Sequence, residues 1–321
     1  MDFRNRKDFP WWNPRFWSDE YPGEHFDTPS TLCGALLARL LADWVRQLGL
    51  TMIIDLGCGD GNLLNHLSKV AESDISLLGI DVRSLPDQPG VTFRKHYWSV
   101  SHECWKASDS AGPGASSSMW PSAPALAFAV EWLDDLPAGV SAREPGGSAH
   151  EIDPEGNRRP LSPADADWLK QWWPGPGRAV VGRTRDRAWQ WLAERLPPGS
   201  ILATIDYGHV RGDRPSDGGL AAHYRGAPVR PGAAGNTTAA VAVDALAAAV
   251  EDIGAERWWF HRLADLPPDF WPVDDDRPLT HLALRSQRQL LTDPAHFGNF
   301  WLVAHRIPAR GAADSGGSGR P

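Results

Sequence analysis

The sequence predicts an α/β protein built on a doubly wound, mostly parallel sheet, with helical insertions and an N-terminal helical segment. Short apolar runs that are typical of buried strands alternate with segments whose apolar residues recur at helical spacing. The first of these strands leads through a glycine-rich turn into a helix and then into a second strand. This alternation places helices on both faces of a sheet whose ligands bind at the carboxyl ends of its strands.

The chain begins with an aromatic arm, residues 1–25, that shows no periodic pattern. A helix follows, opened by Thr28 and Pro29, because leucines, Trp44 and Val45 then recur at helical spacing as far as residue 48. Gly49 is placed to end this helix as a C-terminal cap.

The central part of the sheet is expected from four apolar runs and one crossover helix. The strands are TMIIDL at 51–56, SLLGIDV at 76–82, VTFRKHYW at 91–98 and ALAFAVEWL at 125–133. The helix NLLNHLSKV at 62–70 connects the first two strands. The intervening stretch 107–124 has low complexity and predicts a loop, and so does the Gly-, Pro- and charge-rich stretch 138–160.

The C-terminal half is expected to complete the sheet. Ser162 and Pro163 mark the start of one helix, and a polar loop should run up to Gly235. The further helices are predicted at 184–196, at 236–254 with Asn236 as its cap, and at 280–291, and the further strands at 200–208, 256–263 and 299–307. We expect one domain over 26–307, with insertions at about 138–199 and 209–253, and a disordered tail at 308–321.

Composition limits the classes of function. The formal net charge is −8 and the basic residues are scattered, which argues against nucleic acid as a partner. Cys33, Cys58 and Cys104 are far apart, and His96 and His102 lack ligand spacing, so neither a disulfide framework nor a metal site is predicted. The first residues do not form a signal peptide and no run reaches the roughly 18 apolar residues of a membrane helix. We expect a cytoplasmic protein without a membrane span, and the sequence leaves its oligomeric state open.

The glycine turn of IIDLGCGDGN is the strongest candidate for a binding site. Gly57, Gly59 and Gly61 permit positive φ angles and a close approach of the backbone to a ligand, although such a turn can also be purely structural. A dinucleotide fingerprint would place glycine at 62, where this chain has Asn62, and no G-K-[ST] continuation is present to hold a triphosphate. Asp55, just before the turn, suits a cationic amino group better than a pyrophosphate.

Asp81 ends the next predicted strand, where a carboxylate can accept hydrogen bonds from both hydroxyls of a ribose. The alternative is an ordinary cap at the end of a strand. D-L-G-C-G-D-G followed by G-I-D resembles the first two motifs of the class I S-adenosylmethionine-dependent methyltransferases with a Rossmann-like fold, and NFWLVAHRI resembles their last, reversed strand. This resemblance implies S-adenosylmethionine as the cofactor.

An acidic turn follows the fourth predicted strand. Glu131, Asp134 and Asp135 would lie where the methyl group is transferred, and carboxylates there could orient an amine or other cationic nucleophile. The alternative is a solvated strand-to-helix turn in which Asp134 or Asp135 is the helix cap.

Several segments together resemble the MidA family of methyltransferases, whose mitochondrial members assist assembly of respiratory complex I by methylating an arginine of a subunit. The resemblance is spread over HFDTPSTLCGALLARLL, EWLDDLP, IDYGH, HYRG and NTTAAVAVDAL, in the order of the family, from about residue 25 to 245. It implies cofactor contacts for the glycine turn and its neighbours, Asp55, Gly57, Cys58, Gly59, Gly61 and Asp81. It also implies that Thr28 to Ser30 fold over the cofactor, and that Glu131, Asp134, Asp206 and Tyr207 line the methyl-transfer site.

The chain departs from the family at three positions. Val130 replaces the Asn of N-E, Asn236 replaces the Asp of D-I-T-A-H, and Ala240 replaces its His. The departures concern the acceptor side, so the cofactor is expected and the acceptor is open. We expect a methyltransferase for a protein arginine or amine-type acceptor. The alternatives are a small-molecule O- or N-methyltransferase and a non-catalytic cofactor-binding assembly factor, with a nicotinamide oxidoreductase a distant further one.

Overall fold

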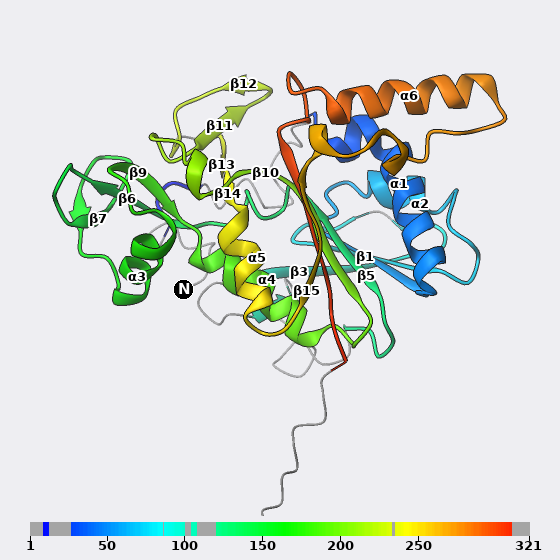
Figure 1. The fold of residues 1–321 in the computed structure, drawn as a ribbon, viewed down its shortest axis with the longest axis horizontal. Helices are drawn as coiled ribbons and strands as arrows, with labels where there is room; N and C mark the ends of the chain where they lie inside the picture. Colours follow the sequence, from blue (N-terminus) through cyan, green and yellow to red (C-terminus); the bar gives the residue numbers. More distant parts are fainter. Residues whose placement is uncertain are drawn as a thin grey trace, which may run out of the picture.

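A computed structural model describes residues 9–12, 27–85, 87–99, 104–107, 120–232 and 235–309 (Figure 1). Most of the predicted N-terminal arm, of the loop at 107–124 and of the tail at 308–321 lies outside these residues. In the described part of the chain, no helix has both the length and the apolar character that crossing a membrane requires.

The main sheet has the predicted doubly wound, mostly parallel character. Its strand order is β15-β16-β10-β5-β1-β2-β3-β4, with β14 paired to β10. Five neighbouring strands run parallel, namely β10, β5, β1, β2 and β3, and the late strand β16 is antiparallel to both of its neighbours. The bounds are β1 (Met52–Leu56), β2 (Ser76–Asp81), β3 (Val91–Ser99), β4 (Cys104–Ala107), β5 (Leu126–Val130), β10 (Ile201–His209), β14 (Val241–Ala242), β15 (Glu256–Arg262) and β16 (Phe300–Arg306).

Helices cover both faces of this sheet because successive strand residues point to opposite sides. In β1, Ile53 joins the core beneath α1 (Pro29–Leu48), α2 (Asn62–Leu67) and α6 (Pro278–Thr292). Its neighbour Ile54 joins the core beneath α4 (Arg183–Arg195) and α5 (Val243–Glu251). Figure 1 shows the first group of helices on one side of the sheet and the second on the other. The chain leaves β1 where the strand order reverses, which is where ligands of such sheets bind.

The long first helix begins and ends where the sequence indicates. The Thr28 side chain accepts a hydrogen bond from the backbone N–H of Thr31, whose hydroxyl bonds the backbone N–H of Thr28 in return. At the other end Gly49 adopts φ +63°, the left-handed conformation that favours glycine. The helix bends at Cys33, and beyond the bend the backbone N–H of Leu36 donates to Oε1 of Gln287 in α6.

The stretch 138–160 was predicted as a loop, and this prediction is wrong. It folds with later residues into a second, antiparallel sheet of order β8-β7-β6-β9, beside α3 (Pro163–Trp172), which Ser162 caps as predicted. Short hairpins of this kind need few apolar residues, because the buried residues of these four strands are Val140 and Ser141 of β6 and the end of β9. The bounds are β6 (Gly139–Arg143), β7 (Ala149–Ile152), β8 (Arg158–Arg159) and β9 (Gly177–Val181).

The predicted helix at 236–254 begins later than expected. Asn236 opens a strand and does not cap a helix, and α5 starts only at Val243. The β-branched Thr237 and Thr238 favour the extended chain. The polar loop before it also contains strands, so that β11 (Leu220–Tyr224), β12 (Ala227–Pro228) and β13 (Asn236–Ala239) form a third small sheet. Short 3-10 turns complete the described chain at η2 (Arg211–Asp213), η3 (Leu263–Asp265) and η4 (Pro268–Phe270).

Candidate functional site

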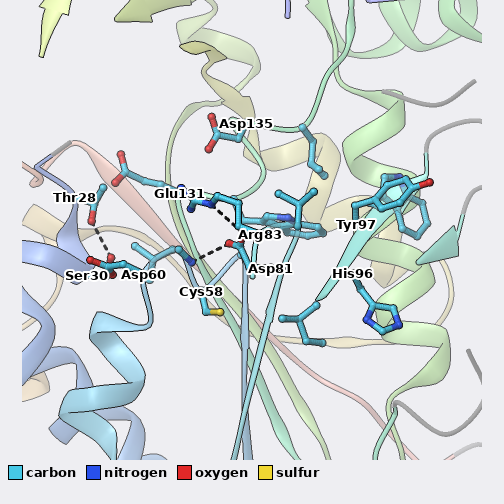
Figure 2. Close-up of a pocket in the computed structure, with 18 of the residues that line it drawn as sticks. Thr28, Ser30, Cys58, Asp60, Asp81, Arg83, His96, Tyr97, Glu131 and Asp135 are labelled. Atoms are coloured by element: carbon cyan, nitrogen blue, oxygen red, sulfur yellow. Dashed lines mark hydrogen bonds and ion pairs between the residues drawn. The ribbon is translucent and has the colours of Figure 1, made fainter. Parts of the chain in front are cut away.

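A cavity of about 270 Å³ opens at the carboxyl ends of β1, β2 and β5 (Figure 2). It gathers residues that lie far apart in the sequence, from the start of α1 to β13. The predicted site residues that line it are Thr28, Ser30, Gly57, Cys58, Gly59, Asp81 and Glu131. The predicted residues that are not part of its lining are Asp55, Gly61, Asp134, Asp206 and Tyr207.

The glycine turn needs glycine for its backbone conformation. Gly57, Gly59 and Gly61 have φ angles of +70°, +59° and +77°, all in the left-handed region. A Cβ on Gly57 would lie 2.5 Å from Cδ1 of Trp132, so the indole packs directly against the bare backbone. A Cβ on Gly59 would meet only the guanidinium of Arg83, at 3.8 Å. Gly57 therefore serves packing, whereas Gly59 leaves space in the cavity.

Asp81 fixes the turn and keeps little capacity for a ligand unless its partner moves. Its Oδ2 accepts the backbone N–H of Gly59 at 2.9 Å, and its Oδ1 accepts the backbone N–H of Arg83 at 2.9 Å and Nε of Arg83 at 3.2 Å. A carboxylate has about four acceptor positions, so one is left. A diol could donate to two acceptor positions of Asp81 if the side chain of Arg83 moved away and released the one that its Nε occupies.

Glu131 combines three unusual properties at the edge of the cavity. Its φ of +47° is rare for a residue with a side chain, and its backbone N–H donates to the carbonyl of Ile205 at 2.9 Å. Its Oε2 is buried and has no hydrogen-bond partner among the described residues. Burial, followed by repulsion from Asp134, Asp206 and Asp135, raises the pKa of this carboxyl group well above its usual range. The positive φ and the unpaired buried oxygen single out Glu131 as a candidate functional residue.

Asp206 and Asp134 support the acidic turn from behind. Oδ2 of Asp206 accepts the backbone N–H groups of Leu133 and Asp134 at 3.0 and 3.3 Å. The carbonyl of Asp134 accepts Nη2 of the buried Arg185 at 2.8 Å. Burial raises the pKa of the Asp134 carboxyl to about 7 and that of Asp206 well above its usual range. The side chain of Asp206 and the backbone of Asp134 therefore hold the turn that carries Glu131.

Three other predicted residues also lie outside the cavity lining. The Tyr207 hydroxyl shares a hydrogen bond of 2.6 Å with that of Thr238. Asp55 is only 3% exposed, and burial, with smaller contributions from Asp81 and Asp60, raises its pKa to about 8. Gly61 packs against a neighbouring Gln side chain and Phe93.

The first turn of α1 covers one end of the cavity, as Figure 2 shows for Thr28 and Ser30. The hydroxyls of these two residues lie 2.8 Å apart. Nδ2 of Asn62, the residue that breaks the dinucleotide fingerprint, donates to the carbonyl of Ser30 at 2.8 Å. The start of α2 thus holds the start of α1 against the glycine turn.

Asp135, which the sequence places on the acidic turn, accepts a hydrogen bond of 3.0 Å from Nδ2 of Asn236, and both side chains line the cavity. The sequence did not indicate several other residues of the cavity lining. Arg83 lines the cavity, and its pKa is raised by Asp81 and Asp135, although burial opposes this. The aromatic residues Tyr97, Trp98, Trp105 and Trp132, together with His96, form the remaining wall. The only indication in the sequence was the clustering of aromatic residues at 96–105.

Within the described ranges, no group of three or more His, Cys, Asp or Glu residues could hold a metal ion.

Among the solved structures that this chain resembles, two share its overall fold. One is a candidate methyl transferase from Burkholderia thailandensis with bound S-adenosyl-homocysteine, which has 17% identity and a TM-score of 0.62 over 96% of this chain and 89% of the other. The second, an uncharacterized protein of the same superfamily and organism, has 19% identity and a TM-score of 0.59 over 88% and 81%. At these identities the likeness shows the fold. No protein-family model matches the sequence, and neither does any curated protein.

Proposed function

We propose that this protein is an S-adenosylmethionine-dependent methyltransferase that acts on a nitrogen acceptor, an amine or a guanidinium. The observation that carries the proposal is one cavity bounded by the left-handed glycine turn, the strand-end carboxylate Asp81 and the strained Glu131. A fold shared with a protein that binds S-adenosyl-homocysteine supports the same ligand here.

The residues present fit this cofactor. Gly59 leaves space beside Arg83, Asp81 offers an acceptor for a ribose hydroxyl, and Thr28 and Ser30 present hydroxyls at one end of the cavity. Asp55 lies directly behind the turn, and burial raises its pKa to about 8, so a ligand with an amino group and a positive sulfur would favour its ionised form. S-adenosylmethionine, when bound, would supply a methyl group on a positively charged sulfur. A nitrogen lone pair can attack this methyl group, with the sulfur as the leaving group.

Glu131 is the residue best placed to serve the acceptor. Its carboxyl group lines the cavity and can accept a hydrogen bond from an N–H of the acceptor, which orients the nitrogen lone pair. As the new N–C bond forms, the same carboxylate can take the proton that the nitrogen loses. A raised pKa makes this carboxylate a stronger base once it is ionised. Asp206 keeps Glu131 in place by holding the turn that follows it.

Asp135 and Asn236 favour a cationic acceptor at the same end. The family that the sequence resembles has an acidic residue at position 236, and here the carboxylate of Asp135 lies against Asn236 instead. An acidic group is therefore kept on the cavity wall, and because burial raises its pKa a cationic acceptor would favour its ionised form. We accordingly extend the proposal to a protein arginine or a comparable amine, as the MidA resemblance implies, with Val130 as the remaining departure on the cavity wall.

The test is methyl transfer from labelled S-adenosylmethionine to a lysate of the source organism, followed by size fractionation of the product. Glu131→Gln should lower transfer about 100-fold and leave cofactor affinity within a few fold, whereas Glu72→Gln, at an exposed site, should change neither. Label in small molecules would favour the alternative of a small-molecule acceptor. Cofactor binding without transfer above a Gly59→Arg control would favour a non-catalytic assembly factor, and absence of binding would refute the proposal.

A further inference from the structure

A buried arginine behind the acidic turn joins two chain segments at the end of the cavity proposed for the acceptor. Arg185, in the first turn of α4, is 1% exposed. Its Nε and Nη2 both donate to the carbonyl of Leu136 at 3.1 Å, and Nη2 also donates to that of Asp134 at 2.8 Å. Nη1 donates to the carbonyls of Ala239 and Ala240 at 2.9 and 3.4 Å. The side chain thus makes as many hydrogen bonds as a guanidinium has N–H groups.

The same two segments supply side chains to the cavity. Asp135, which Figure 2 labels, and Asn236 line it and share their hydrogen bond of 3.0 Å, although they lie 101 positions apart in the sequence. Asp135 stands between the two residues of the acidic turn whose carbonyls Arg185 binds. Asn236 opens β13, and Arg185 binds the carbonyl of Ala239 at the end of that strand. Arg185 therefore holds both members of the pair from behind.

The start of α4 strengthens this connection. The hydroxyl of Thr184 donates to the carbonyl of Pro137, another lining residue, at 2.9 Å. The carbonyl of Asp134, which accepts Nη2 of Arg185, also accepts the backbone N–H of Ala239 at 3.1 Å. The guanidinium and β13 thus meet at one carbonyl of the acidic turn.

A buried guanidinium without a carboxylate partner is costly. In the part of the chain that the structure describes, Arg185 makes no ion pair, and its hydrogen bonds all go to backbone carbonyls. An apolar side chain could fill the same space without the cost of burying a cation. A planar fork of donors, however, can bind the carbonyls of two segments at a fixed separation. The arrangement therefore favours a role in geometry over a role in stability alone.

We propose that Arg185 is a positioning residue for methyl transfer, which holds Asp135 and Asn236 together so that the carboxyl group of Asp135 faces the acceptor. This inference rests on the proposed function. It adds a residue that lies outside the cavity lining and acts through the two segments it binds. Loss of the guanidinium should separate the pair and impair use of the acceptor, whereas cofactor binding at the glycine turn should change little.

The first measurement uses the ligand-free protein and needs no acceptor. In protein labelled with ¹⁵N at asparagine, NMR follows exchange of the Asn236 side-chain amide with solvent, and the signal lost in Asn236→Ser identifies it. In Arg185→Met and Arg185→Lys this exchange should be about tenfold faster, because the bond to Asp135 is weakened. Lysine keeps the charge but lacks the planar fork that binds both segments.

The second measurement is label transfer from S-adenosylmethionine to a lysate of the source organism at increasing dilution. Both Arg185 variants should need about tenfold more lysate for half-maximal transfer, and calorimetry should give affinities for S-adenosyl-homocysteine within about threefold of wild type. Leu192→Ala is the matched control for lost stability, because Leu192 is fully buried about two turns further along α4. Arg187→Met, at an exposed arginine of the same helix, is the control for lost charge. Both controls should exchange and transfer as wild type does at temperatures where thermal unfolding shows them folded.

The inference is overturned if the Asn236 amide exchanges in the Arg185 variants as it does in wild type, or if their transfer falls no further than that of Leu192→Ala. Wild-type behaviour of Arg185→Lys alone would also overturn it, because charge without the fork would then be enough. If Arg185→Met does not fold, Arg185→Lys alone decides. If wild type binds no S-adenosyl-homocysteine, the proposed function fails and the acceptor role with it, whereas the amide exchange still decides whether Arg185 holds the pair.

Discussion

Gly57→Ala should destabilise the protein far more than Gly59→Ala, although both glycines adopt left-handed backbone conformations in one turn. Their φ angles are +70° and +59°. An alanine in this conformation costs about 1–2 kcal/mol at either position. The two sites differ in what the new methyl group would meet.

At residue 57 the methyl carbon would lie 2.5 Å from Cδ1 and 2.9 Å from Cγ of Trp132, whose ring is buried and stacked on Trp105. Displacing a packed side chain of this kind costs a further 1–3 kcal/mol, roughly. At residue 59 the methyl carbon would meet only the mobile end of Arg83, at 3.8 Å. The expected losses of unfolding free energy are thus about 2–5 kcal/mol for Gly57→Ala and about 1–2 kcal/mol for Gly59→Ala.

Equilibrium urea denaturation of the ligand-free variants measures these losses, and calorimetry with S-adenosyl-homocysteine measures binding. Because Gly59 lines the cavity, its alanine variant should lose affinity by about tenfold or more while remaining folded. Equal destabilisation by the two substitutions would refute the packing role of Gly57. Unchanged affinity of Gly59→Ala would refute the assignment of the turn to the ligand.

Three further outcomes are expected. Asp206→Ala should cost about 2–4 kcal/mol in urea denaturation, since it leaves the buried N–H groups of Leu133 and Asp134 unpaired, whereas Asp206→Asn keeps an acceptor and should cost less. Asp55 holds its proton up to a pKa of about 8 in the folded state but releases it near 4 when unfolded, so stability is lost as the pH rises between these values. Asp55→Asn should reduce that slope in melting temperatures taken from pH 5 to 8, and an unchanged slope would contradict the shift. Tyr207→Phe should cost about 1 kcal/mol and leave cofactor affinity unchanged, because the ring lies outside the cavity lining.

The parts of the fold that the sequence predicts well are those fixed by local pattern. The first helix, with Thr28 and Gly49 at its ends, and the strand, glycine turn and helix around Gly57 depend on neighbouring residues only. The position of Asp81 could be predicted as well. It ends β2, and the parallel register of β1 and β2 brings that end next to the glycine turn.

The acceptor side depends on long-range pairing, which local pattern does not encode. Asn236 has the residue type of a helix cap, yet its side chain bonds Asp135, 101 positions earlier, and the chain around it is a strand. His96 and Trp105 lie together at the cavity only because β3 extends beyond its pairing with β2 and pairs there with the antiparallel strand β4. A polar or aromatic residue in such a place looks like ordinary surface or core until the register is known.

The protonation of the carboxyl groups around the cavity depends on the charge of the bound ligand. Burial raises the pKa of Asp55 to about 8, and it raises the pKa values of Glu131 and Asp135 well above their usual range. The buried guanidinium of Arg185 donates to backbone carbonyls, and Arg83 pairs with the aspartate at the end of β2, so nearby cations neutralise these carboxyl groups only in part. They therefore hold protons until a positive ligand favours the ionised form. Under the proposed function the sulfur of the ligand loses its positive charge when the methyl group leaves, although the amino group keeps its own. The same carboxylates would therefore hold the product less tightly than the substrate, so the charges that favour cofactor binding also favour release after transfer.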